Sequence, residues 1–254
     1  MKTKVFFYLC LIMLAGLFQL SGCRRDREAD GAPETAERPQ TINLEFATFW
    51  PAVDFQVTEG HHAWANEIAG RVSGETPHTV NFNWHYGGSL LGPTEIYEGV
   101  SDGVADIGST CPLYTMGVFP LTMGIELPGY KNDNALTASV TIHEAWKNSL
   151  DIQKEYEDVK IMHFWATGPG DFITNTPIRR MEDLSRQQIR AAGGSALAIT
   201  ALGGTPVSMP MSESYVALDS GIVDGLLGPT DTLRGFRLAE VSRYITRLIS
   251  LCPT

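Results

Sequence analysis

A short pattern occurs twice in this sequence, at an interval of 118 residues, and it constrains the fold more than any other feature. Residues 94–106 read TEIYEGVSDGVAD, and residues 212–224 read SESYVALDSGIVD. The identical pairs are Glu95 and Glu213, Tyr97 and Tyr215, Gly103 and Gly221, and Asp106 and Asp224. Each copy predicts a helix, capped by Thr94 or Ser212, that ends at a glycine and is followed by a short strand. Two unrelated helices with the same end signals could also match this well, but the common interval favours two related lobes.

Strand and helix signals alternate along the rest of the chain. Strands are predicted at residues 42–48, 79–86, 107–111, 159–166, 188–191 and 207–209. Helices are predicted at residues 57–72, 94–103, 136–150, 196–202 and 212–221. This alternation predicts an α/β fold, with lobe I at residues 41–165 and lobe II at 166–229. Two lobes imply a cleft between them, and such clefts are preferred ligand sites.

The N-terminus has the features of an export signal. Lys2 and Lys4 precede an apolar run over residues 5–20, which is short for a membrane-spanning helix. The ending Leu-Ser-Gly-Cys resembles a bacterial lipobox, so residues 1–22 are predicted to be a lipoprotein signal peptide and Cys23 the lipidated anchor. An ordinary cleaved signal or a transmembrane anchor are the alternatives. The remaining residues up to position 40 are highly charged and predict a disordered tether.

Charge and cysteine content exclude several classes of protein. The first 40 residues hold six of the 19 basic and five of the 29 acidic side chains, so the body has 13 basic against 24 acidic. This balance argues against a nucleic-acid partner, because phosphates require a basic surface. Cys111 and Cys252 could pair in an exported protein, but two partly buried thiols are favoured. No Cys/His spacing typical of a metal site is present.

One cation stands out in this acidic body. Arg190 lies at the end of a predicted strand, shortly before Gly193 and Gly194. In open α/β sheets ligands bind beyond the carboxyl ends of the strands. A guanidinium there can hold a carboxylate through two parallel charge-assisted hydrogen bonds. A structural ion pair with Asp171 or Asp224 is the alternative.

The longest motif in the chain resembles a known family. It runs P-I-x-x-M-E-D-L, then I-R, then L-G-G-x-P-V-x-M-P, then E-x-Y-x-A-L-x-x-G-I-V-D-G, within residues 177–225. This pattern, with GGSLLGPTEIYEGVSDGVADIG, resembles the DctP-like solute-binding proteins of TRAP transporters, from about residue 44 to the end. The resemblance implies a two-lobed, periplasmic-binding-protein-like fold and a salt bridge between Arg190 and the solute's carboxylate. It also implies lobe closure, docking on TRAP-type permease subunits, and import driven by an ion gradient.

Two departures from the family pattern qualify that resemblance. Many members have a second pocket arginine where this chain has Asp171, in GDFITNTPI. An acidic side chain there disfavours a dicarboxylate, and could receive an ammonium or hydroxyl group of the solute, or pair with Arg190. Members also usually continue beyond LISLCPT, so residues 230–254 are expected to return toward lobe I with the family's C-terminal portion absent.

Further pocket candidates are the aromatic and apolar residues near strand ends. Phe49 and Trp50 either line the cleft or cap the core. The resemblance places Tyr114 at the cleft, and Met211 where members often contact the ligand. Trp165 ends a predicted strand, where core packing is slightly favoured.

No enzymatic signature accompanies these features. His61 and His62 lack the Glu-x-x-His spacing of a metalloprotease and are interpreted as a surface pair. Neither a Gly-x-Ser-x-Gly elbow nor a nucleotide-binding glycine pattern occurs. The sequence therefore predicts a lipid-anchored solute-binding protein at the periplasmic face of a bacterial membrane, without a cofactor or enzymatic activity. Its solute would be a small monocarboxylate with an apolar or aromatic part. The alternatives are a receptor for a membrane sensor kinase and a truncated, non-binding remnant.

Overall fold

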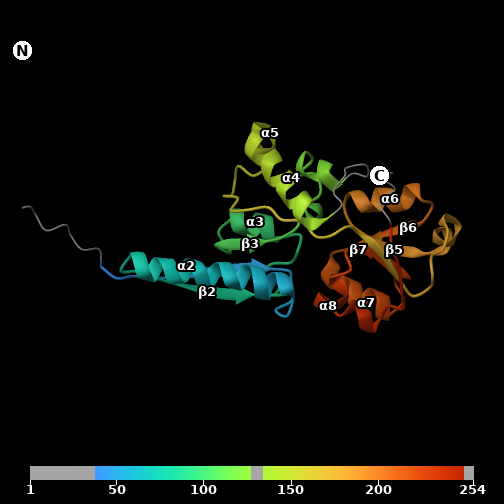
Figure 1. The fold of residues 1–254 in the computed structure, drawn as a ribbon, viewed down its shortest axis with the longest axis horizontal. Coiled ribbons are helices and arrows are strands. Elements are labelled where there is room, and N and C mark those ends of the chain that lie inside the picture. The colour runs from blue at the N-terminus through green and yellow to red at the C-terminus, as the bar shows by residue number, and fades with distance from the viewer. Residues whose placement is uncertain (1–37, 127–133, 249–254) are drawn as a thin grey trace, which may run out of the picture. The chain divides into compact units, whose positions relative to one another are not determined.

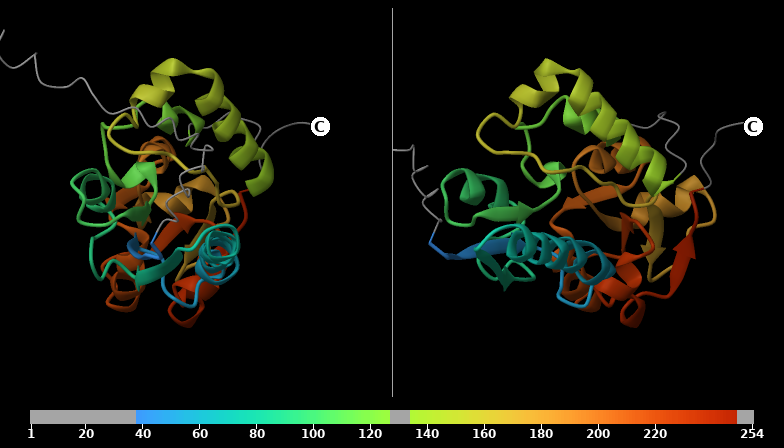
Figure 2. Two further views of the ribbon diagram at one scale, coloured as in Figure 1. Left: turned by 90° about the vertical axis from the view of Figure 1, so that its left-hand side faces the viewer. Right: turned by 60° about the vertical axis from the view of Figure 1, so that its left-hand side comes forward.

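A computed structural model describes residues 38–126 and 134–248. Contacts divide the chain into two units, Met1–Arg38 and Pro39–Thr254, and the description below concerns the second. The predicted signal peptide, Cys23 and Cys252 lie outside the described residues. The strands form two separate sheets, coloured blue to green and yellow to red in Figures 1 and 2.

The first sheet is parallel and contains three strands in the order β2-β1-β3. Its strands are β1 (Thr41–Thr48), β2 (Thr79–His85) and β3 (Ile107–Ser109). The helical segments of this part are η1 (Gln56–His61), α2 (His62–Glu75) and α3 (Ile96–Ser101). Figure 1 shows α2 lying along β2, with which it is in contact. The strands and helices predicted for this part are confirmed to within a few residues.

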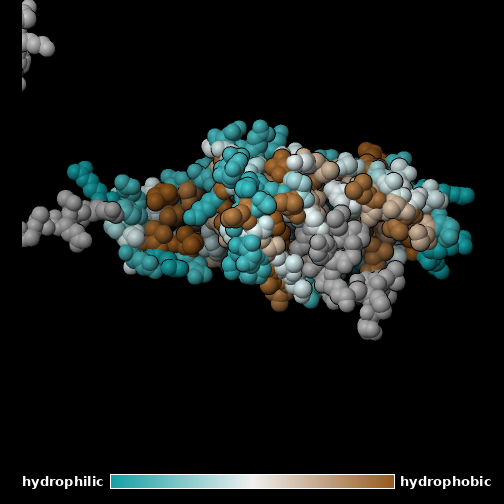
Figure 3. Space-filling model, turned by 90° about the horizontal axis from the view of Figure 1, so that it is seen from above, coloured by the Kyte–Doolittle hydropathy of each residue, from teal (hydrophilic) through white to brown (hydrophobic). Residues whose placement is uncertain are grey.

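The two faces of this sheet differ in polarity, because side chains alternate along each strand. On the face toward α2, the ring of Phe46 lies 4.6 Å from that of Trp84 and 5.2 Å from that of His61. Figure 3 shows apolar side chains gathered where α2 and β2 lie in Figure 1, and a depression of about 420 Å³ lies between these elements. On the other face, amide, carboxylate and imidazole groups bond across the strands; the pairs are Asn81 with Asn43, Asn83 with Glu45, and His85 with Glu45.

The histidine pair does not lie on the surface as predicted. His61 is buried against Phe46. The ring of His62 lies 4.7 Å from Trp84, and its Nε2 atom is 2.8 Å from the hydroxyl of Tyr86. The sequence prediction failed because the helix packs on β2 along the side that carries both imidazoles.

The second sheet is mixed, with five strands in the order β6-β5-β7-β4-β8. Its strands are β4 (Asp171–Thr174), β5 (Gln188–Ala191), β6 (Thr205–Ser208), β7 (Gly225–Gly228) and β8 (Tyr244–Thr246). Strands β5, β6 and β7 are parallel, whereas β4 is antiparallel to both β7 and β8. The carboxyl ends of the three parallel strands therefore meet at one edge, and Arg190 lies there, in register with Val207 and Leu226.

Helices and short turns connect these strands. Those of the second half are η4 (Met181–Arg186), α6 (Gly194–Ala201), η5 (Met211–Glu213), α7 (Ser214–Asp219), α8 (Thr232–Gly235) and η6 (Leu238–Glu240). Along the sequence, the segment between β3 and β4 forms η2 (Pro112–Tyr114), η3 (Thr122–Glu126), α4 (Ala135–Asn148) and α5 (Leu150–Lys154). The predicted strand at 159–166 is wrong, because residues 160–170 have no regular secondary structure. Met162 and His163 are exposed there, and the next strand begins only at Asp171.

The two copies of the repeated pattern make equivalent contacts. The carboxylate of Asp106, before β3, accepts a 2.8 Å hydrogen bond from the Glu45 N–H of β1. The carboxylate of Asp224, before β7, accepts a 2.8 Å bond from the Gln188 N–H of β5. Each aspartate thus fixes a neighbouring parallel strand in register. This shared contact supports the interpretation of residues 94–106 and 212–224 as a repeat. Contrary to the sequence prediction, Glu95 and Glu213 rather than Thr94 and Ser212 hold the N-cap positions of these helices.

Candidate functional site

Arg190 is the central residue of the candidate site. Only 4% of its surface is exposed, and no other arginine or lysine within residues 38–126 and 134–248 is buried. Its Nε atom donates a 2.9 Å hydrogen bond to the Met209 carbonyl, and its Nη2 atom a 3.4 Å bond to the Tyr114 hydroxyl. These contacts use the Nε atom and one N–H of Nη2. The other N–H groups of the guanidinium can donate hydrogen bonds to a ligand.

Tyr114 links the two halves of the structure at this point. Its hydroxyl oxygen accepts hydrogen bonds from Arg190 and, at 3.1 Å, from the Met211 N–H. Burial raises the pKa of Tyr114 to about 12, so the phenol stays neutral at physiological pH. A hydroxyl has one proton and two acceptor lone pairs. Because both bonds use the oxygen as acceptor, the proton can be donated to an anionic ligand.

Aromatic rings surround this polar centre. Phe49 lies edge-on to Tyr114 at 5.3 Å and 4.5 Å from Trp50. Trp50 lies 5.6 Å from Trp165 and 5.4 Å from Phe236. These distances are typical of favourable ring pairs. We call Phe49, Trp50, Tyr114, Trp165 and Phe236 the aromatic cluster.

The structure therefore brings together six of the seven residues predicted from the sequence. Met211 is buried in the same core, next to Gly228 at the end of β7. Phe236 was missed, because it follows a four-residue helix in a segment without periodicity. Cys111 is half-buried against this core, and its state and that of Cys252 stay predictions.

Asp171, the seventh predicted residue, has other partners. It begins β4 and is 8% exposed. Its carboxylate accepts a 2.9 Å hydrogen bond from the Leu248 N–H and lies 4.0 Å from the guanidinium of the exposed Arg247. Asp171 thus holds the backbone of the segment that follows β8, and its hydrogen bond and ion pair are with that segment rather than with Arg190. Its contact with a solute stays a prediction.

A second polar group lies beside the aromatic cluster and was not anticipated. Asp54 is 2% exposed and accepts a 2.9 Å bond from the Gln56 N–H. The Gln56 side chain donates a 3.5 Å bond to Asp231, which precedes α8. Burial raises the pKa of Asp54, and the charge of Asp231 adds to this effect. Burial also raises the pKa of Asp231.

Gly235 accommodates this group at close range. A Cβ atom at Gly235 would lie 1.8 Å from an oxygen of Asp54, so only glycine fits there. The sequence contains a signal for none of the three polar residues, because segments about 175 positions apart meet only in the folded chain.

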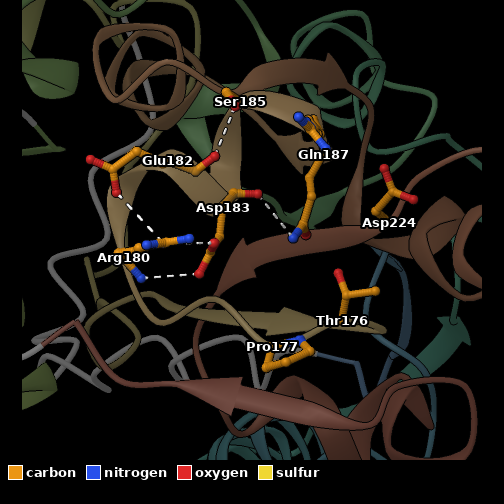
Figure 4. Close-up of a pocket in the computed structure, with 9 residues that line it drawn as sticks. Thr176, Pro177, Arg180, Glu182, Asp183, Ser185, Gln187 and Asp224 are labelled. Atoms are coloured by element: carbon orange, nitrogen blue, oxygen red, sulfur yellow. Dashed lines mark hydrogen bonds and ion pairs between the residues drawn. The ribbon is translucent and has the colours of Figure 1, made fainter.

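Two depressions in the described surface lie away from Arg190. One of about 550 Å³ is lined by residues around η4 and by Asp224, as Figure 4 shows. The other is the one beside α2. Arg190 and the rings of Phe49 and Trp50 are instead buried. Within the described ranges no group of three His, Cys, Asp or Glu side chains could hold a metal, and no helix has the length and apolarity to cross a membrane.

A buried arginine near the carboxyl end of parallel strands, hydrogen-bonded to a tyrosine that packs against Phe49, is an arrangement typical of anion-binding sites in α/β proteins. Residues 52–248 match the family of bacterial extracellular solute-binding proteins, family 7 (DctP), and the chain belongs to this family. The family comprises solute-binding transport proteins, not enzymes.

Similar proteins include both dicarboxylate and aromatic-acid binders. The C4-dicarboxylate-binding periplasmic protein DctP of Rhodobacter capsulatus is 30% identical over 48% of this chain and 37% of its own. A TRAP periplasmic solute-binding protein of Desulfovibrio salexigens, with a neighbour's C-terminus in its ligand site, is 34% identical. It aligns with a TM-score of 0.62 over 80% of this chain and 61% of its own. A marine metagenome TRAP protein specific for aromatic acids, with bound 3-hydroxybenzoate, is 25% identical. Its TM-score is 0.75 over 81% of this chain and 63% of its own.

These matches cover only part of each relative. The chain spans 53%, 37% and 54% of the first three curated relatives, which is about half of their length. The structural neighbours are two-lobed, and the mixed α/β fold of this chain agrees with the predicted fold class. The lobe boundaries stay a prediction.

Proposed function

We propose that this protein captures a small organic monocarboxylate with an aromatic or apolar part and delivers it to a TRAP-type membrane importer. The observation that carries the proposal is the buried guanidinium of Arg190, hydrogen-bonded to Tyr114 of the aromatic cluster. One guanidinium matches one carboxylate in charge and geometry. A second carboxylate on the solute would have no buried cation to meet in the described part of the chain.

The chemistry of capture follows from these contacts. Because Nε of Arg190 already donates to a carbonyl, its two terminal nitrogens are the donors for the carboxylate. The Tyr114 proton adds a third donor. Low local polarity strengthens these charge-assisted bonds relative to water. The rings of Phe49, Trp50 and Phe236 would pack against the apolar part of the solute.

We also infer that the protein acts outside the cytoplasm, on the periplasmic face of a membrane, with lipidated Cys23 as its anchor. The basic start, the apolar run and the Leu-Ser-Gly-Cys ending support this inference. Fractionation of cells that produce the Cys23→Ala variant checks it. The variant should leave the membrane fraction, and unchanged membrane retention would contradict lipidation.

A thermal-shift screen tests capture. A ligand that binds only the folded chain raises the melting temperature. With benzoate or phenylacetate at a hundredfold excess over Kd, a rise of about 5 °C is expected, and succinate should give less. Arg190→Ala should abolish the rise, whereas Arg179→Ala, at an exposed arginine, should retain it. If the folded chain responds to no carboxylate, or Arg190→Ala still responds, the proposed function is wrong.

A further inference from the structure

Three polar atoms at the edge of the aromatic cluster are buried without a partner. They are Nε1 of Trp50, Oε1 of Gln56 and Oδ1 of Asp231. Buried polar atoms in native proteins nearly always have a hydrogen-bond partner, and each exception requires an explanation. Gln56 is 7% exposed, so bulk water does not supply the partner for its carbonyl oxygen.

The three atoms belong to elements that meet at the aromatic cluster. Trp50 is itself part of the cluster, with its ring 5.4 Å from that of Phe236. Asp231 precedes α8, directly after which Phe236 lies. Gln56 follows Trp50 by six residues and donates to Asp231 across 3.5 Å. The unpartnered atoms therefore lie on the chain segments that carry the rings.

The chemistry of this group is opposite to that of the Arg190 end. Two carboxyl groups and an amide oxygen gather here, with Asp54 only 2% exposed. Burial raises the pKa of Asp54 and that of Asp231, although the charge of the exposed Arg234 acts in the opposite direction on Asp54. Acceptors in such surroundings require a hydrogen-bond donor. A solute carboxylate would be repelled here and directed to Arg190.

Phe49 contacts both ends of the aromatic cluster. Its ring lies 5.3 Å from Tyr114, which contacts Arg190, and 6.4 Å from Phe236, which follows α8. A solute with an aromatic ring would thus have its carboxylate at one end of the cluster and a ring substituent at the other.

We propose that Gln56 and Asp231, with the indole N–H of Trp50, form a second recognition point that selects a hydroxyl group on the ring of the bound acid. A hydroxyl suits this mixture of donor and acceptors, because it donates its one proton to the Gln56 or the Asp231 oxygen and accepts from the indole N–H of Trp50. An amino group can donate but is a poorer acceptor, so it fits less well. This inference rests on the proposed function and names the solute class more narrowly.

Calorimetric titration of the purified chain tests the proposal. The ligands are benzoate, 3-hydroxybenzoate, 4-hydroxybenzoate, 3-aminobenzoate and 3-methoxybenzoate, of which the last lacks a donor on the ring. At least one hydroxybenzoate should bind about tenfold more tightly than benzoate, because the protein oxygens would otherwise stay unpaired. The methoxy compound should show no such advantage, and the amino compound an intermediate one.

Variants assign the preference to these residues. Gln56→Met keeps the length of the side chain and removes the acceptor, so the hydroxyl advantage should fall below about threefold while benzoate binding is retained. Asp231→Asn should also reduce the preference for the hydroxybenzoate over benzoate. This second variant tests the proposal even if Gln56→Met does not fold. Gln187→Met is a matched control. Gln187 is 8% exposed and also has an unpartnered Oε1 atom, but it lies by the η4 depression in Figure 4. Its variant should retain the full preference.

The outcomes separate this inference from the proposed function. Equal affinity for benzoate and both hydroxybenzoates, with binding dependent on Arg190, would overturn the second recognition point and leave the proposed function in place. A preference that survives both Gln56→Met and Asp231→Asn would also overturn it. Binding of no carboxylate by the folded chain would refute both.

Discussion

The Tyr114 hydroxyl illustrates how one residue of this site serves both stability and binding. It accepts hydrogen bonds from the Arg190 side chain and the Met211 N–H. Tyr114→Phe would leave both donors buried and unpaired. We expect the free energy of unfolding to fall by about 1–3 kcal/mol, because each such group loses its compensation for lost hydration. Urea denaturation measures this change.

Tyr215→Phe is the matched control for that substitution. The Tyr215 hydroxyl bonds to the carboxylate of Glu240 at an exposed position, 3.2 Å away. Removal of this hydroxyl should lower the free energy of unfolding by about 0.5 kcal/mol or less. If both variants lose the same stability, the hydroxyl of Tyr114 is not an essential link between Arg190 and the neighbouring backbone.

Residues of the site were predictable to different degrees. Arg190 was a candidate because strand ends in α/β sheets face ligands, and because the surrounding motif resembles a family; the structure shows that it is buried. Phe49 and Trp50 were candidates because they follow the first strand, and Trp165 because it ended a predicted strand that the structure lacks. Gln56 and Asp231 could not be found, because only tertiary folding brings these irregular segments together. A buried acid looks the same in a sequence as an exposed one.

At the scale of elements, the repeated helix–glycine–strand unit depends on its glycines. Gly103 and Gly221 have φ angles of 76° and 74°, in the left-handed region that side chains disfavour. A Cβ atom at either position would meet no atom within 4 Å. Gly103→Ala and Gly221→Ala should therefore each lower the free energy of unfolding by about 1 kcal/mol through backbone strain alone. Thermal unfolding by circular dichroism checks this.

Gly70→Ala is the control at the same scale. Gly70 lies within α2, has an ordinary helical φ and also has no atom within 4 Å of a new Cβ. Alanine there should raise stability by roughly 0.5–1 kcal/mol, since it reduces the freedom of the unfolded chain. A stabilising effect at Gly103 or Gly221 would contradict the proposed strain.

The elements themselves followed largely from periodicity and end signals. β1, β2, α2 and α4 were predicted because each contains a clear alternating or helical pattern of apolar residues. The strand predicted at 159–166 has a similar pattern but pairs with no strand in the described structure. Two of its residues pack against other rings instead: Phe164 against Trp146, and Trp165 against Trp50. Local pattern alone does not distinguish these two outcomes.

At the scale of the whole molecule, buried ionisable groups make stability depend on pH. Burial lowers the pKa of His61 to about 4, and the charges of His163 and His62 act in the same direction. The unfolded chain takes up this proton near pH 6.5, and the folded chain only near pH 4. Between these values the unfolded state binds more protons, so stability falls as the pH is lowered. Asp54 and Asp231 oppose this change, because burial raises the pKa of each.

Replacement of the imidazole isolates its contribution. His61→Leu keeps an apolar group against Phe46 and removes the titration. The difference between a pKa of 6.5 in the unfolded chain and about 4 in the folded chain corresponds to roughly 3 kcal/mol. The wild type should therefore lose about that much stability relative to the variant between pH 7.5 and pH 4, measured by urea denaturation at each pH. At pH 8 both chains are neutral at this position, so the difference there reports packing alone. Parallel stability curves from pH 8 to pH 4 would show that His61 is not what makes the fold sensitive to acid.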